Sequence, residues 1–541
     1  MKKISTWGFV CSLFFFLLLS SCQDQATTNS TEEESVDTYY QEQHRPQFHF
    51  SPPTMWMNDP NGMVYYEGEY HLFYQHYPDS NVWGPMHWGH AVSPDLVHWE
   101  NLPIALYPDT LGYIFSGSAV IDWNNTSGLG ETEGDSLRPP MIAIYTYHDT
   151  ARLAAGRNDF QTQGIAYSTD KGRSWEKYAG NPVIPNTEKI RDFRDPKVIW
   201  SEEYQKWIMV FAADDRSRFY SSPNLIDWKF LSDWGADIGA HGGVWECPDF
   251  FPMTDQKSGA TKWVLIQSLN PGGPNGGSAT QYFIGDFDGE NFQLDPDFQQ
   301  ALENGNENAM WIDYGRDNYA GVTWSDIPKA DGRRIFLGWM SNWNYARVVP
   351  TEIWRSAMTI PRTLSLRQTS QGYRLLSQAV QELTQLRIST NTVESQTLDD
   401  TLDLSELATP LMEIEVELDF PENGECEFGI ELFNDQGETY RIGFDQAQNQ
   451  YYSDRRKAGK IDFSDQFGAK LHLAPAQISS STRKLHLFID KASIELFADD
   501  GTLTMTDIFF PTLPFNGLRF YAQGGEVSLT EVKIYSLKSI W

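Results

Sequence analysis

Three short motifs in this chain each present a carboxylate at a position where the backbone is restricted. They are residues 56–62 (WMNDPNG), 194–196 (RDP) and 245–249 (WECPD), which contain Asp59, Asp195 and Glu246. Hydrolysis of a glycosidic bond typically uses one carboxylate at the anomeric carbon and one carboxylic acid that protonates the leaving oxygen. The motifs therefore predict an acid/base pair accompanied by a third acid.

A proline follows each of these acids within two positions, at residues 60, 196 and 248. Proline disfavours helix at its own position and at the residue before it, so we expect all three acids at strand ends or in loops. Taken singly, each motif also fits an ordinary turn. Asp195 also fits a structural ion pair with Arg194 or Arg191, and Glu246 also fits a carboxylate at the rim of a Gly-rich segment.

The composition excludes some classes of partner. The 541 residues include 41 Lys and Arg against 73 Asp and Glu, a formal net charge of -32 at pH 7. This charge repels nucleic acid and suits a neutral substrate, so we expect no nucleic-acid partner. The 19 Trp, 25 Tyr and 32 Phe suit stacking on sugar rings, although all-β folds also place aromatic residues in cores and strands. No spacing of Cys and His indicates a metal site, and no cofactor motif is present.

The first 21 residues have the layout of a secretory signal peptide, with Lys2 and Lys3 before an apolar run too short for a typical membrane span. Residues 19–22 (LSSC) resemble a bacterial lipobox, which predicts cleavage before Cys22 and lipid attachment to that residue. An ordinary signal peptide with an incidental Cys is the alternative. Because residues 23–37 contain hardly an apolar side chain, we expect a flexible tether over residues 22–44. The expected location is outside the cytoplasm, anchored by lipid on the periplasmic or the outer face.

An element of the form Ser-turn-Trp recurs along the first two thirds of the chain. Its copies are residues 93–99, 168–175 and 222–228, with a looser version at residues 285–292. Between the copies lie short alternating or apolar runs that predict strands. Strand groups that recur at intervals of about fifty to eighty residues indicate the blades of a β-propeller, here over residues 45–370. The repeats alone leave the number of blades open.

The pattern changes near Arg362. Residues 377–386 have helical apolar spacing without Gly or Pro, which predicts a linker helix within residues 371–388. Strict alternation then follows, for example in residues 412–418 and 484–490. Alternation of this kind is typical of strands with one solvated face, so we expect a β-sandwich domain over residues 389–541.

The motifs together resemble those of glycoside hydrolase family 32, the β-fructosidases that include invertases, inulinases and levanases. Further matches to the family are residues 115–118 (FSGS), 338–343 (GWMSNW), 361–362 (PR) and 494–501 (IELFADDG). The resemblance covers nearly all of the mature chain. It implies an all-β fold in which a five-bladed β-propeller is followed by a C-terminal β-sandwich.

The resemblance also implies roles for the acids. Asp59 would be the nucleophile that attacks the anomeric carbon of a fructofuranosyl unit, and Glu246 the general acid that later deprotonates water. Double displacement would then retain the β configuration. Asp195 would bind sugar hydroxyls and stabilise the oxocarbenium-like transition state. We expect Arg194 to keep Asp195 ionised, whereas Glu246 has to be protonated near the working pH.

Around these acids, the resemblance implies a set of sugar-binding residues and no metal or organic cofactor. The set consists of Asn58, Gln75, Trp83, Phe115, Ser116, Arg194 and Trp343. Amides donate to and accept from hydroxyls, and indole rings offer faces to a sugar. For an isolated Trp or Phe in a β-rich chain, core packing is the alternative.

The expected substrates are fructans (levan or inulin), fructooligosaccharides and sucrose. Residues 338–343 resemble exo-acting levanases and inulinases more than invertases, which favours release of fructose from chain ends. A fructosyltransferase with the same three acids and a non-catalytic fructan-binding surface lipoprotein are alternatives. The propeller arabinanases and xylosidases also use three carboxylates. Linkage preference, exo or endo action, the membrane face, the oligomeric state and the role of the sandwich stay open.

Overall fold

The computed structural model describes residues 39–133, 136–304, 309–370, 372–422 and 424–541, which together form one compact unit. The fold is almost entirely β. Its two α-helices within the described residues are short: α1 (Thr150–Ala154) and α2 (Pro296–Asn304). No helix in this part of the chain has the length and apolar character needed to cross a membrane.

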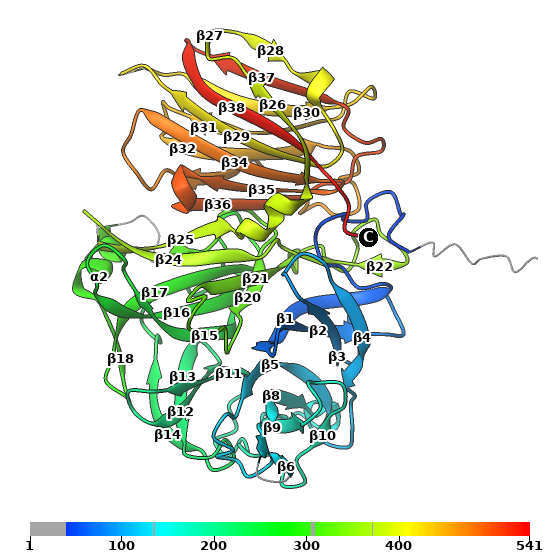
Figure 1. Cartoon of the computed structure of the whole chain (residues 1–541), viewed down its shortest axis with the longest axis vertical. Helices are drawn as coiled ribbons and strands as arrows, with labels where there is room; N and C mark the ends of the chain where they lie inside the picture. The colour runs from blue at the N-terminus through cyan, green and yellow to red at the C-terminus, as the bar shows by residue number, and fades with distance from the viewer. Residues whose placement is uncertain (1–38, 134–135, 305–308, 371, 423) are drawn as a thin grey trace, which may run out of the picture. The chain divides into compact units, whose positions relative to one another are not determined.

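Within the described residues, five sheets follow one another along the first two thirds of the chain (Figure 1). The first sheet, in the order of hydrogen-bonded neighbours, is β22 (Trp354–Arg355), β1 (Met55–Tyr66), β2 (Glu69–Tyr77), β3 (His87–Ser93), β4 (Glu100–Leu106). The second, in the same order, is β5 (Tyr113–Ile121), β8 (Met141–His148), β9 (Gln161–Ser168), β10 (Glu176–Lys177). The third is β11 (Phe193–Ser201), β12 (Lys206–Ala213), β13 (Arg216–Ser222), β14 (Lys229–Trp234). The fourth is β15 (Val244–Thr254), β16 (Thr261–Asn270), β17 (Ala279–Phe287), β18 (Phe292–Leu294), with β19 (Met310–Trp311) beside β17. The fifth is β20 (Tyr319–Thr323), β21 (Arg334–Met340), β24 (Arg362–Thr369), β25 (Gly372–Ala379), with β23 (Ala357–Met358) beside β21.

The innermost strands of these sheets form a closed ring. In the order β1, β5, β11, β15 and β20, each strand contacts the next, and β20 contacts β1. The short strand β22 pairs in parallel with β1, with Met55 opposite Trp354, so a late segment of the propeller completes its first sheet. A sheet array closed in this way protects its edges. The predicted propeller is confirmed, and the described residues form five blades.

The recurring Ser-turn-Trp element is the connection between the third and fourth strand of a blade. In the first blade, Ser93 ends β3, and the Asp95 side chain accepts the backbone N–H groups of Val97 and His98 at 3.0 and 2.8 Å. Asn224 plays the same part after β13. A short polar side chain that accepts nearby backbone N–H groups stabilises such a turn.

Two further sheets form the C-terminal sandwich. One contains β26 (Arg387–Val393), β38 (Val527–Leu537), β29 (Met412–Asp419), β34 (Thr482–Asp490), β35 (Ser493–Ala498) and β36 (Leu503–Ile508), with β27 (Gln396–Leu398) beside β38. The other contains β28 (Thr401–Asp403), β37 (Gly517–Gln523), β30 (Glu427–Phe433), β31 (Thr439–Asp445), β32 (Gln450–Lys457) and β33 (His472–Pro475). The remaining elements of the described residues are the hairpin β6 (Glu131–Glu133) and β7 (Ser136–Arg138), and the 3-10 helices η1 (Gln381–Leu386), η2 (Ser405–Leu407) and η3 (Asp499–Gly501). In β29, Ile414, Val416 and Leu418 are buried while the residues between them are partly exposed, as the alternation predicts.

Two predicted segments differ in the structure. Instead of a linker helix over residues 371–388, β25 pairs with β24 as far as Ala379, and only the 3-10 helix η1 follows. Pairing along the whole of β24 outweighs the helical spacing. The predicted tether is also too long, because Gln43 and His44 hydrogen-bond to Pro511 and Tyr40 stacks on Trp541 at 3.9 Å. The predicted signal peptide, Cys22 and residues 22–38 lie outside the described residues.

Two of the family-like segments, residues 361–362 and 494–501, meet where the fifth blade contacts the sandwich. Arg362 is fully buried and ion-pairs with Glu495 of β35 and with Asp313 at 2.8 Å. His49 contacts Glu495 at 3.0 Å and Asp490 at 2.8 Å. Burial lowers the pKa of His49, but its hydrogen bonds to these two carboxylates outweigh burial and raise the pKa to about 9. These charged residues join the two domains.

Candidate active site

A β-bulge interrupts the innermost strand of each of the five described blades. The bulged segments run from Met57 to Pro60 in β1, Ile114 to Gly117 in β5, Arg194 to Lys197 in β11, Glu246 to Asp249 in β15 and Tyr319 to Val322 in β20. A bulge leaves a residue unpaired, re-aims neighbouring side chains and accommodates proline. The three acids therefore lie within strands, at bulges. The expectation of strand ends or loops is wrong for Asp59, which is the fifth residue of β1, but it fits Asp195 and Glu246, which are the third residues of β11 and β15.

The bulged segments bring the predicted site residues to one cavity of about 560 Å³. Every predicted catalytic and substrate-binding residue lines it: Asn58, Asp59, Gln75, Trp83, Phe115, Ser116, Arg194, Asp195, Glu246 and Trp343. The sequence interpretation missed the other lining residues, which are His148, Leu153, Phe160, Gln161, Arg191, Asp192, Asn270 and Arg347. Most of these lie outside the family-like motifs, so no local pattern marked them.

Asp59 is held by donors on both carboxyl oxygens. The Ser116 hydroxyl donates to Oδ2 at 2.7 Å and the Asn58 amide to Oδ1 at 3.0 Å. Trp56 Nε1 donates to Oδ1 of the Asn58 side chain at 2.7 Å, which orients that side-chain amide toward Asp59. Burial and the neighbouring Glu246 raise the pKa of Asp59, while these donors act in the opposite direction.

Asp195 adopts a left-handed backbone conformation, with φ +65°. Its Oδ2 accepts the backbone N–H of Cys247 at 3.0 Å, and its own N–H donates to Thr146 Oγ1 at 3.0 Å. Burial raises the pKa of Asp195 to about 7 even though Arg194 opposes the shift. Arg194 lowers the pKa of this carboxyl as expected, but desolvation outweighs the effect of a cation whose Nε is 3.8 Å away.

Glu246 has a donor on each carboxyl oxygen. Arg194 donates from Nη2 to Oε1 at 3.0 Å, and the Tyr319 hydroxyl donates to Oε2. Arg194 also donates to Asp192, so its guanidinium serves two carboxylates other than its sequence neighbour. Tyr319 lies on β20 in the fifth blade, and no predicted motif contains it.

The Cys247 side chain contacts both Asp59 and Asp195. Its Sγ lies 3.4 Å from Asp59 Oδ2 and 3.6 Å from Asp195 Oδ2. Burial, followed by the nearby carboxyl groups, raises the pKa of this thiol well above its usual range, so it is a protonated donor. Asp59 and Asp195 therefore share one donor, from the residue that directly follows Glu246. The residue belonged to a quoted motif, but its role was not predicted.

Aromatic side chains surround the acids. Phe115 packs edge-on against Trp83, with ring centroids 6.1 Å apart, and stacks on His148 at 4.2 Å. The Arg347 guanidinium lies 5.8 Å from the ring centre of Trp83 and 5.6 Å from that of Trp343. Gln75 is fixed by donation from Nε2 to the Ile114 carbonyl at 3.1 Å. A cavity lined by both carboxyl groups and aromatic rings suits a hydroxyl-rich neutral ligand.

A potential metal cluster among the described residues lies in the sandwich, outside this cavity. Ligand atoms of Glu413, Glu415 and His486 lie within 4.8 Å of one another. Arg387 ion-pairs with both carboxylates, and His486 contacts Glu413 at 2.7 Å. One guanidinium, which is not a metal ligand, thus already pairs with both carboxylates of the cluster.

Comparison with known proteins identifies the family of this chain. The model of the glycosyl hydrolases family 32 N-terminal domain matches residues 49–379, and that of the C-terminal domain matches residues 380–536. A levanase of Bacillus subtilis (strain 168) is 46% identical over 507 residues, 93% of this chain and 72% of the relative. An extracellular exo-inulinase of Aspergillus niger is 39% identical over 526 residues, 93% of this chain and 96% of the relative. The crystal structure of exo-inulinase from Aspergillus awamori is similar with a TM-score of 0.83 and 34% identity, covering 93% of this chain and 100% of that one. With family models matched to both domains, the chain belongs to glycosyl hydrolases family 32.

Proposed function

We propose that this glycoside hydrolase is a retaining β-fructofuranosidase that releases fructose from fructan chains and also accepts sucrose. One observation carries the proposal: Asp59, Asp195 and Glu246 converge on a single cavity with aromatic walls. The similarity to a levanase and to exo-inulinases supports fructan as the substrate. The cavity volume of about 560 Å³ lies within the range of small-molecule sites, which favours entry of a chain end over a long internal segment.

In the proposed mechanism, Asp59 attacks the anomeric carbon and Glu246 protonates the departing oxygen. Water, deprotonated by Glu246, then releases the fructosyl unit with its original configuration. Retaining enzymes hold the two working carboxyl groups about 5 to 5.5 Å apart. After burial, the Glu246 charge is the next cause that raises the pKa of Asp59, which supports a short separation.

The surrounding donors have complementary parts in this mechanism. Ser116 and Asn58 hold Asp59 in one orientation for attack. Arg194 and Tyr319 occupy one oxygen of Glu246 each, so the carboxyl group is oriented before substrate arrives. Asp195 supplies a third carboxylate that accepts sugar hydroxyls and stabilises positive charge in the oxocarbenium-like transition state.

A time course of products from levan, inulin and sucrose, each supplied separately to residues 23–541, tests the function. Fructose as the only early product from one or both polymers is the expected result. Early oligosaccharides would indicate endo cleavage, and chains that grow from sucrose would indicate a fructosyltransferase. No product from any of the three would leave a fructan-binding protein or a pentosidase.

We further propose export, with a lipid anchor at Cys22. The charged and apolar leader followed by LSSC supports this location, and the name of the Aspergillus niger relative includes the word extracellular. In cells supplied with a labelled fatty acid, the full chain should carry the label and partition into detergent, whereas Cys22→Ser should do neither. Equal labelling of both chains would contradict lipidation at this residue.

A further inference from the structure

One segment of the propeller brings two side chains to the active-site cavity without regular secondary structure of its own. Residues 341–349 form turns, and Trp343 and Arg347 from this segment line the cavity. On the propeller side, Asn342 fixes the segment, with Nδ2 donating to the Arg316 carbonyl at 2.8 Å and to the Ser278 carbonyl at 3.2 Å. A segment of this kind depends on contacts with other elements for its conformation.

The other anchor of this segment is Tyr345, which is buried and does not line the cavity. Its hydroxyl donates to Asp317 Oδ1 at 2.6 Å and accepts from Nη2 of Arg455 at 2.7 Å. The Tyr345 ring also meets Phe467 edge-on, with centroids 5.1 Å apart. Arg455 and Phe467 belong to the sandwich, so one hydroxyl joins the segment to the second domain.

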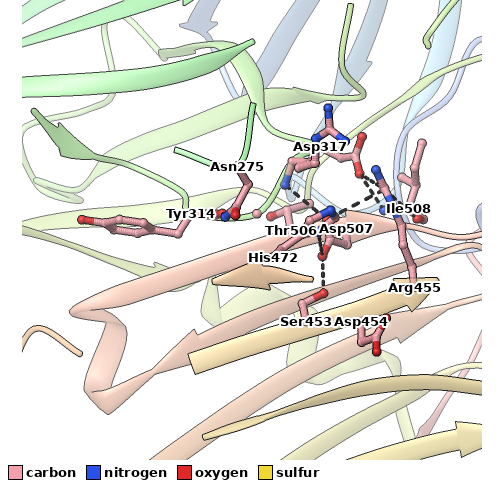
Figure 2. Close-up of polar contacts among 12 residues, drawn as sticks. Asn275, Tyr314, Asp317, Ser453, Asp454, Arg455, His472, Thr506, Asp507 and Ile508 are labelled. Carbon is pink, nitrogen blue, oxygen red and sulfur yellow. Dashed lines mark hydrogen bonds and ion pairs between the residues drawn. The ribbon is translucent and has the colours of Figure 1, made fainter. Parts of the chain in front are cut away.

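Arg455 has a partner for every donor atom of its guanidinium. It lies on β32 with no exposed surface, and Nη1 donates to Asp317 Oδ2 at 2.5 Å and to the Ile508 carbonyl at 3.0 Å (Figure 2). Nε donates to the Phe467 carbonyl at 2.9 Å. A planar guanidinium held in this way has one orientation, and removal of a partner would leave a buried charge unpaired.

The same network fixes Asp317 from the sandwich side. Its backbone N–H donates to the Thr506 carbonyl at 3.0 Å, and its Oδ2 accepts the Ile508 N–H at 3.0 Å. Asp317 therefore cannot shift without breaking contacts with β36. Because Tyr345 depends on Asp317 and Arg455 together, the position of residues 341–349 is set jointly by the propeller and the sandwich.

We propose that Tyr345 and Arg455 are positioning residues through which the sandwich sets substrate affinity in the propeller. They hold residues 341–349 so that Trp343 and Arg347 face the sugar. The inference rests on the proposed fructosidase function and assigns the sandwich a role in that reaction. Because Tyr345 touches none of the three acids, its loss should weaken binding more than it slows the chemical step.

Tyr345→Phe is the sharpest test, because it removes the hydroxyl and leaves the ring. Tyr440→Phe is a control: the Tyr440 hydroxyl is buried in the sandwich, contacts Ser453 at 2.6 Å and Asp507 at 3.4 Å, and makes no contact with residues 341–349. Loss of a buried hydrogen bond to a charged group is worth roughly tenfold in an equilibrium constant. We expect KM for fructan to rise about tenfold in Tyr345→Phe, with kcat changed less than about threefold, and both constants unchanged in Tyr440→Phe.

Hydrogen exchange of the full chain adds a readout that needs no activity. In Tyr345→Phe the amides of Ala346 and Val348, bonded to Asn342 and Tyr345 carbonyls at 2.9 Å, should exchange faster than in the wild type and in Tyr440→Phe. Equal exchange or equal KM in the two variants would overturn the proposal. An inactive wild-type protein would instead refute the proposed function, and exchange would still decide whether Tyr345 holds the segment.

Discussion

Replacing Asp195 by Asn is expected to stabilise the folded protein at neutral pH while it removes activity. Asp195 is buried, and burial raises its pKa from 3.8 to about 7. Asn keeps the size of the side chain and an oxygen that accepts the Cys247 N–H, and it tolerates the left-handed backbone at this position. Only the ionisable proton and the charge are lost.

The size of the effect depends on pH. A folded-state pKa above the unfolded value contributes stability that is fully present below pH 3.8 and is lost as pH rises through about 7. Each pH unit between these values removes about 1.4 kcal/mol, which gives about 1.5 kcal/mol at pH 5 and about 4 kcal/mol at pH 8. An unfolding entropy of about 2 cal/mol/K per residue over about 500 residues converts these values to about 2 °C and about 4 °C in Tm.

The assay is thermal unfolding of wild type and Asp195→Asn at pH 5 and pH 8, together with turnover of fructan. We expect the Tm of the variant to exceed that of the wild type by more at pH 8, with turnover reduced at least a hundredfold. Asp326→Asn is a control, since burial raises the pKa of Asp326 to about 6, its φ is +58°, and it does not line the cavity. It should gain Tm in the same direction and keep full turnover. A Tm difference that is independent of pH, or a loss of Tm, would refute this account of Asp195.

Two other residues give further tests. Tyr319→Phe removes the donor to Glu246 Oε2 and should lower kcat/KM about ten- to a hundredfold on every substrate, as measured by initial rates; an unchanged rate would mean that this hydrogen bond does not assist the acid. Because burial raises the pKa of Cys247, iodoacetamide at pH 8 should leave the native enzyme active and should label Cys247 only after unfolding in urea. Rapid loss of activity would show that this thiol is ionised or accessible.

The sequence predicted the acids because their residue types and immediate neighbours are local features. It did not predict that they lie at bulges, because a bulge is defined by the partner strand. Pro60 and Pro196 correctly excluded helix, but the same restriction fits a loop, a strand end and a bulge. Adjacency suggested Asp195 as the partner of Arg194, and the two groups do form an ion pair at 3.8 Å. The fold adds closer contacts of the same guanidinium with Glu246 and Asp192, which the sequence did not indicate.

Residues that reach the site from other blades left no local signal. Tyr319 lies 73 positions from Glu246, so only closure of the propeller brings its hydroxyl to the carboxyl group. The linker shows the converse: the apolar spacing of residues 377–386 fits a helix, and residues 381–386 do form the 3-10 helix η1. Pairing of β25 with β24 decides the conformation only as far as Ala379. The five-bladed propeller and the sandwich could be predicted from the motifs, whereas the contacts between them, such as Arg455 with Tyr345, could not.

The central claim is that Asp59 forms a covalent bond to the fructosyl unit while Glu246 serves as acid and base. Glu246→Ala, given a β-fructofuranoside whose leaving group needs no proton, should accumulate this intermediate, because the second step lacks its base. Mass spectrometry of peptides from the acid-quenched protein is the direct measurement. We expect one fructosyl unit on the peptide that contains Asp59, and none when Asp59→Ala is added. A fructosyl unit on another residue, or release of the leaving group with inversion and without an adduct, would contradict the account.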